Sequence, residues 1–128
     1  MADEDFCTII NKSKGKPARL PFDSIREKIL GPKYELSVIF LSSIAQKKLN
    51  TTYRGKNKST NILSFPLSKN SGEITFDLSL VKKESKDFDM TYPQFLKYLF
   101  IHGCLHLKGF VHSSTMDKEE KKYLKIFS

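Results

Sequence analysis

All three histidines of the chain lie in one short segment, HGCLHLKGFVH, at residues 102–112. Positions four apart on an α-helix lie about 5 to 6 Å from each other on one face, so His102 and His106 can bind the same metal ion. Gly109 is placed to end that helix in a left-handed conformation, and His112 follows as a third ligand. Three neutral imidazoles with one position left for water form the ligand set of a catalytic zinc site. The segment therefore predicts one bound Zn²⁺ per chain, although such ligands also accept Ni, Co or Cu.

Two residues between these histidines limit the ligand set and the reaction that the site could catalyse. Cys104 lies about 200° round the helix from His102, so it faces away from the predicted ion and is not a fourth ligand. The spacing H-x3-H-x2-G-x2-H also occurs in metzincin proteases, which need a Glu directly after the first His as general base. Gly103 occupies that position here. The segment therefore argues against a zinc peptidase.

Basic residues are concentrated in one part of the chain. With 22 Lys and Arg against 14 Asp and Glu, the net charge is +8. No acidic residue occurs between Glu35 and Glu73, and that stretch holds six basic ones: Lys47, Lys48, Arg54, Lys56, Lys58 and Lys69. Such a local excess is typical of a surface that binds a polyanion such as RNA. A solvated basic surface that aids solubility is the alternative.

The histidines must be positioned by a small set of secondary-structure elements. Strand-like patterns occur at four places, residues 6–10, 34–42, 60–67 and 72–81, the last alternating as a half-buried strand. Helix-like patterns occur at four places: residues 22–30, 43–54, 91–109 and 114–127. Residues 11–21 are polar and contain two prolines, which predicts a loop.

Start and stop signals support these helices. Asp23 is placed to cap the first, and Gly55 to end the second. Thr91 and Gln94 form a capping-box pattern before the histidine helix, and Ser114 with Asp117 suggests another before the last helix. In the histidine helix, Phe95, Leu99, His102 and His106 recur at helical spacing. The two histidines therefore continue its apolar stripe and are expected to face inward or into a cleft.

Length and composition predict one domain spanning residues 1–128, since domains commonly run about 100 to 150 residues. We expect an α/β (α+β) fold with a small mixed β-sheet packed by helices, the metal-binding helix lying near the C-terminus. No apolar run approaches the roughly 20 residues of a membrane helix. The start, MADEDFCTII, lacks the features of a signal peptide, and two cysteines, Cys7 and Cys104, suit a reducing compartment. These features predict a cytoplasmic protein without a membrane partner.

Longer motifs resemble the YbeY-type family of bacterial endoribonucleases, which act in ribosomal RNA maturation. The family motif H-G-x-L-H-L-x-G-[YF]-D-H is matched by His102, Gly103, Leu105, His106, Leu107, Gly109, Phe110 and His112. Its upstream pattern is matched by Leu49, Asn50, Tyr53, Arg54 and Gly55, and by the segment TNILSFP at residues 60–66. Gly72, Glu73 and Ile74 resemble the family's G-D-I step. The resemblance covers about residues 36–127.

The resemblance implies a zinc-dependent enzyme that cleaves single-stranded RNA, acting on small-subunit ribosomal RNA precursors and in ribosome quality control. It implies His102, His106 and His112 as metal ligands and Arg54 as a functional residue of the cleft. A permanently charged guanidinium can bind phosphate in a bidentate way and stabilise charge in the transition state. The nearby lysines are the expected RNA contacts: Lys47, Lys48, Lys56 and Lys58.

One departure from the family motif leaves alternatives open. Val111 stands where the family usually has Asp before the third histidine, which removes a carboxylate that could orient a ligand or handle a proton. Glu73 and Asp77 are candidates for a general base. A non-catalytic RNA or ribosome assembly factor with a structural metal remains a second hypothesis, and a zinc hydrolase of another substrate class a third.

Overall fold

One mixed sheet organises the chain, for which a computed structural model describes residues 6–128. The elements are β1 (Cys7–Asn11), α1 (Phe22–Leu30), β2 (Glu35–Leu41), α2 (Ser43–Arg54), β3 (Ile62–Ser68), β4 (Ser71–Asp77), α3 (Leu78–Ser85), α4 (Tyr92–Lys108) and α5 (Ser114–Ile126). The strand order is β1-β2-β4-β3, with β1, β2 and β4 parallel and β3 antiparallel to β4. Residues 1–5, the acidic start used in predicting the location, lie outside the described part. The predicted α/β (α+β) fold with a mixed sheet is confirmed.

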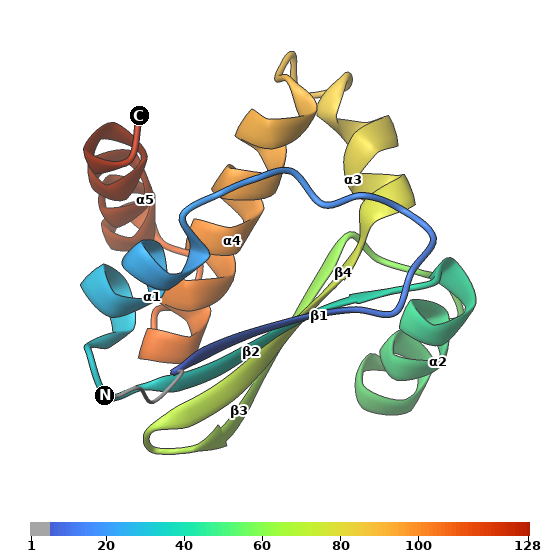
Figure 1. The fold of residues 1–128 in the computed structure, drawn as a ribbon, viewed down its shortest axis with the longest axis horizontal. Coiled ribbons are helices and arrows are strands. Elements are labelled where there is room, and N and C mark those ends of the chain that lie inside the picture. Colours follow the sequence, from blue (N-terminus) through green and yellow to red (C-terminus); the bar gives the residue numbers. More distant parts are fainter. Residues whose placement is uncertain (1–5) are drawn as a thin grey trace.

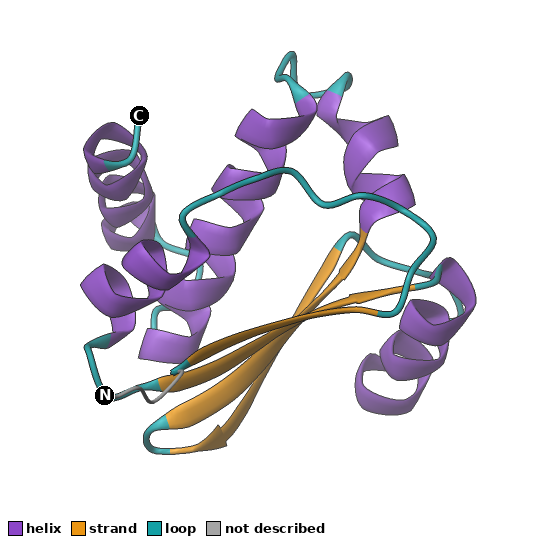
Figure 2. Ribbon diagram, in the orientation of Figure 1, coloured by secondary structure: helices purple, strands orange, loops and turns teal. Residues whose placement is uncertain are grey.

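Helices cover both faces of this sheet. Figure 1 shows α4 running over one face, flanked by α1 and α5, while α2 lies on the opposite side. The helix and strand layers are easiest to separate in Figure 2. The core forms between α4 and the near face of the sheet, where Val38, Phe40, Ile74 and Phe76 are fully buried. Since β3 is an edge strand, segments on the two faces can meet around it.

Glycines allow α4 to pack very close to β3 and β4. A Cβ atom at Gly103 would lie 2.9 Å from Ile62 Cδ1 and 3.1 Å from Ile74 Cδ1. At Gly72 a Cβ would lie 2.6 Å from the Tyr34 hydroxyl. The separations of 2.6 and 2.9 Å are shorter than real Cβ contacts, so a larger residue would force the helix or the neighbouring side chains to shift. The Gly103 that argues against a peptidase therefore also serves this close packing.

The helix signals in the sequence are largely confirmed. The second helix has the predicted bounds, and Gly55 ends it with a φ of 66°. Thr91 and Gln94 form the expected capping box, and Gly109 ends α4 with a φ of 112°. Positive φ is accessible to glycine because it lacks a Cβ atom. These signals depend on local backbone chemistry, which is why they could be recognised without the fold.

The predicted strand at 72–81 is wrong in its second half. The strand ends at Asp77, and Leu78–Ser85 form α3. Asp77 starts this helix because its carboxylate accepts a hydrogen bond from the Leu80 N–H at 3.2 Å. The strand is also buried on both faces, because α2 covers Thr75 and its neighbours on the side that was expected to face water.

Two predicted caps are misplaced. Asp23 does not cap α1, because its carboxylate pairs with the buried Arg26 guanidinium at 2.7 Å. Helix α5 is capped by Ser113, whose hydroxyl accepts from the Met116 N–H, and not by Ser114. In both cases the wrong residue was predicted as the cap, but the helix itself forms at the predicted place.

Candidate metal centre

The three histidines converge as their spacing predicted. His102 and His106 project from the C-terminal half of α4, and His112 comes from the short loop that leads to α5. One imidazole nitrogen of each lies within 4.8 Å of the others. His102 and His106 are partly buried, and His112 is exposed. Within residues 6–128 no other cluster of at least three His, Cys, Asp or Glu side chains has this spacing.

Hydrogen bonds set the protonation of the two helical imidazoles. The Nδ1 of His106 lies 3.1 Å from the Phe110 carbonyl oxygen, and the Nδ1 of His102 contacts the Glu120 carboxylate. Since a carbonyl and a carboxylate only accept, each Nδ1 carries a proton, and in the neutral ring Nε2 then presents a lone pair. The two Nε2 atoms face each other at 3.0 Å. Two lone pairs at this separation repel unless a cation lies near both.

This arrangement fits a metal ion. Two nitrogens bound tetrahedrally to zinc are roughly 3.3 Å apart, given Zn–N bonds of about 2.0 to 2.1 Å. Burial lowers the pKa of His106 below its ordinary value of 6.5, and the neighbouring His102 lowers it further. A lowered pKa keeps the imidazole neutral, which is the form that binds metals. The three-histidine group could therefore hold one ion.

Sequence reasoning missed Glu120. This residue lies on α5, and its side chain is only 8% exposed. A carboxylate behind a metal-binding imidazole fixes the ring's orientation and raises its basicity. The signal available in the sequence was a charged residue on the apolar stripe of α5, between Met116 and Tyr123, which are both buried.

Arg54 shares a cavity with the histidines. The cavity has a volume of about 510 Å³ and is lined by the three histidines, by Tyr53 and Arg54 of α2, and by residues 62–65 of β3. It therefore extends around the edge strand, from α4 on one face of the sheet to α2 on the other. Arg54 is exposed, and no carboxylate of the described residues lines the cavity. The site thus combines a group that could hold a metal with a permanent cation.

The lysines that were predicted to contact RNA do not line this cavity. Lys47 and Lys48 border a separate hollow on the outer side of α2, together with Ile44. Lys56 and Lys58 are exposed in the loop that follows α2. The basic residues of the acid-free stretch therefore lie in different places on the surface. Of the six, only Arg54 lines the cavity of the histidines.

The carboxylates considered as general bases also lie elsewhere. Glu73 and Asp77 are absent from the cavity lining. Asp77 is 1% exposed and accepts hydrogen bonds from the Ser59 hydroxyl and the Leu80 N–H. Val111, which replaces the family's Asp, is 73% exposed and lies outside the cavity. Glu120, whose carboxylate contacts His102, could orient a histidine in the way expected of the Asp that Val111 replaces.

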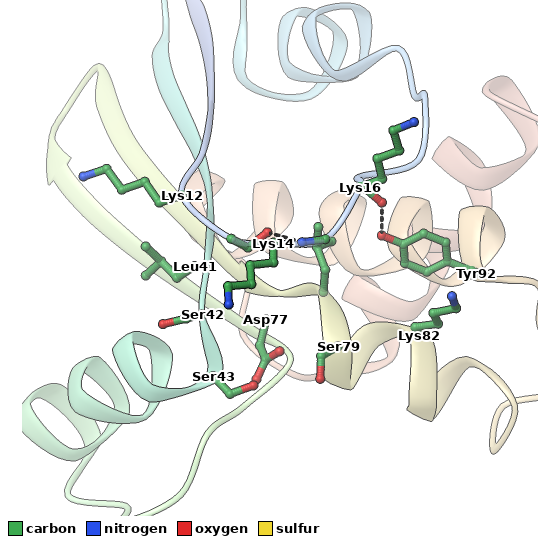
Figure 3. A pocket seen from close by; sticks show the side chains of 13 residues that line it. Lys12, Lys14, Lys16, Leu41, Ser42, Ser43, Asp77, Ser79, Lys82 and Tyr92 are labelled. Atoms are coloured by element: carbon green, nitrogen blue, oxygen red, sulfur yellow. Dashed lines mark hydrogen bonds between the residues drawn. The ribbon is translucent and has the colours of Figure 1, made fainter.

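A larger cavity lies apart from the histidines. It has a volume of about 550 Å³ and is bordered by the loop after β1 and by the first residues of α2 and α3. Figure 3 shows its lysines, Lys12, Lys14, Lys16 and Lys82, and the Tyr92 hydroxyl donating to the Lys16 carbonyl oxygen at 2.9 Å. No histidine lines it, so it does not provide the predicted chemistry.

Comparisons with known proteins agree with the motifs. The model of the family described as Endoribonuclease YbeY matches residues 16–127. A protein of Polynucleobacter asymbioticus with that name is 39% identical over 95 residues, which cover 71% of this chain and 60% of that protein. A Campylobacter jejuni protein of the same name is 33% identical over 107 residues, covering 77% and 79%. The chain spans 55% to 61% of the length of relatives from Polynucleobacter, Bdellovibrio and Thermodesulfovibrio.

A solved structure has a similar fold. The solution structure of TM1509 from Thermotoga maritima aligns with a TM-score of 0.66 at 29% identity, covering 93% of this chain and 87% of that one. In the described part of the chain, no helix combines the length and apolarity that crossing a bilayer requires.

Proposed function

The chain belongs to the YbeY family, and we propose that it is a zinc-dependent endoribonuclease that cleaves single-stranded RNA. The observation that carries this proposal is the cavity that three converging imidazoles and Arg54 line together. We further propose small-subunit ribosomal RNA precursors as the substrate, ribosome quality control as the setting and the cytoplasm as the compartment. The buried free thiol of Cys104 suits such a reducing compartment.

The histidines and their partners would hold the metal. His102, His106 and His112 would supply the ligands, with Glu120 orienting His102 and the Phe110 carbonyl orienting His106. A bound Zn²⁺ lowers the pKa of a water ligand to about 7 and polarises a phosphoryl oxygen. The open side of the cavity would admit the scissile phosphate.

Arg54 would bind the RNA backbone. Its guanidinium stays protonated at any physiological pH and matches two phosphate oxygens at once. Held beside the histidines, it would orient the phosphodiester and stabilise the negative charge that develops on the phosphate. It cannot accept a proton, and no carboxylate of residues 6–128 lines the cavity, so the proton of the nucleophile would pass to solvent or substrate.

Substituting Arg54 tests this assignment. We expect Arg54→Ala to bind one metal per chain, as the wild type does, and to cleave RNA about 100- to 1000-fold more slowly. Arg54→Lys keeps the charge but loses the bidentate geometry, so it should recover only part of the rate. Metal content by elemental analysis and cleavage of a labelled oligonucleotide provide the readouts. Unchanged cleavage by Arg54→Ala would remove Arg54 from the mechanism.

A non-catalytic role with a structural metal is the second candidate. The contact between His102 and Glu120 ties α4 to α5, so an ion there would also fasten the C-terminal helix. Val111 in place of the family's Asp also favours a non-catalytic role, because it removes a carboxylate that could handle a proton. Under this alternative, the metal-loaded protein binds RNA without cutting it. Removing the metal loosens α5 and lowers the melting temperature.

A further inference from the structure

We propose that Tyr53 and Phe65 form a subsite on which one nucleobase of the RNA stacks beside the histidine cluster. This inference rests on the proposed function, because it concerns the same cavity and the same class of substrate. It assigns a role to a side chain that neither the charge pattern nor the metal chemistry explains.

Tyr53 is exposed in an unusual place. Its side chain is 65% exposed although it lies in the last turn of α2 and lines the cavity of the three histidines. The other large apolar side chains that are exposed in the described residues lie outside that cavity: Ile9, Ile44, Leu67, Phe88, Val111 and Ile126. An aromatic ring left open beside a cation and a metal-binding cluster has apolar surface that a planar ligand can cover.

Phe65 holds this ring from the sheet. The centroids of the Tyr53 and Phe65 rings are 5.2 Å apart, and their planes are inclined by 64°. In such an edge-to-face contact only part of the Tyr53 ring is covered, and the rest stays open. Phe65 is partly buried on β3, so Tyr53 rests on a side chain anchored in the sheet. A pre-positioned ring loses little conformational entropy when a base stacks on it.

Tyr53 and Arg54 together match one nucleotide unit. They are consecutive residues at the end of α2, and both line the cavity. The guanidinium suits a phosphate, and the aromatic ring suits the adjoining base. A base is available for stacking only where the RNA is single-stranded, since base pairs in a duplex are already stacked on each other. The pair therefore provides a physical basis for a single-strand preference with little sequence dependence.

A binding experiment without catalysis tests the subsite. The chelator-treated protein, residues 1–128, is titrated with short RNAs that carry 2-aminopurine at successive positions, since the fluorescence of this base is quenched by stacking. We expect quenching at one position with the wild type and with Tyr53→Phe, which keeps the ring. Tyr53→Leu should lose that quenching and bind about 5- to 100-fold more weakly, as expected for the loss of one stacked base.

A matched control and a second readout make the outcomes distinct. Phe88→Leu removes an aromatic ring that is 57% exposed outside the cavity, and it should leave both quenching and affinity unchanged. Equal quenching and affinity in Tyr53→Leu and the wild type would overturn the subsite. If the metal-loaded wild type fails to cut RNA while the Tyr53-dependent quenching persists, the endoribonuclease proposal fails and the subsite stands.

Discussion

Each imidazole on α4 is oriented by a hydrogen-bond acceptor that lies outside α4. The Phe110 carbonyl holds His106 from the chain reversal after Gly109, and Glu120 holds His102 from a different helix. Both contacts leave Nε2 as the atom that faces the centre of the cluster. The spacing of the histidines could predict that they meet, but not which nitrogen each one presents. That choice depends on partners 4 and 18 residues away.

Replacing Glu120 should therefore weaken metal binding without removing a ligand. Glu120→Gln keeps the size of the side chain but loses the negative charge that orients and polarises His102. We expect the metal dissociation constant to rise about 10- to 100-fold, measured by competition with a chromogenic chelator. Glu119→Gln is the matched control on the same helix, because Glu119 makes no contact with the histidines. Equal affinities for the two variants would show that Glu120 does not support the site.

At the scale of elements, the site depends on α2 and α4 meeting around the edge strand β3. The sequence was sufficient to place both helices, because their caps, glycine ends and apolar stripes are local signals. It could not place the end of α2 beside the end of α4, because that requires the strand order β1-β2-β4-β3. The same limit explains the error after Asp77, where alternation continued in the sequence while the chain had already entered α3.

A methyl group at Gly103 should disturb this arrangement. Gly103→Ala places a Cβ within 2.9 to 3.1 Å of Ile62, Ser64 and Ile74, so α4 or the strand side chains must shift. We expect a loss of about 1 to 3 kcal/mol in the free energy of unfolding, measured by urea denaturation, despite alanine's better helix propensity. Lys108→Ala, at an exposed position of the same helix, serves as the control. A Gly103→Ala protein as stable as the wild type would mean that the close packing is not needed.

Across the whole molecule, the positive charge is spread around the candidate site instead of filling it. Of the six basic residues in the acid-free stretch, Arg54 alone lines the cavity, while Lys47 and Lys48 lie on the outer side of α2. The larger cavity is bordered by Lys12, Lys14 and Lys16 of the loop after β1 and by Lys82 of α3, which lies far from them in the sequence. We propose that the lysines of α2, Lys47 and Lys48, contact backbone phosphates away from the cavity of the histidines.

Salt dependence of RNA binding tests this role for the α2 lysines. Replacing Lys47 and Lys48 together by Ala removes two phosphate contacts, and each contact contributes about one to the slope of log affinity against log salt. We expect that slope to fall by about two and affinity to drop equally for different RNA sequences, with metal content unchanged. The control replaces two exposed lysines of α5, Lys121 and Lys122, and so removes the same charge elsewhere. The same slope in both double variants would exclude a local contact.

A metal titration tests whether an ion held by the three histidines cuts RNA. Metal-free protein receives increasing Zn²⁺ while ion occupancy and single-stranded RNA cleavage are measured on the same samples. We predict that the cleavage rate rises in proportion to occupancy and reaches a plateau at one ion per chain. His106→Ala should neither retain the ion nor cleave above the protein-free background. Full occupancy without cleavage, or undiminished cleavage by the metal-free wild type or by His106→Ala, would show that an ion at the three histidines is not what cuts RNA.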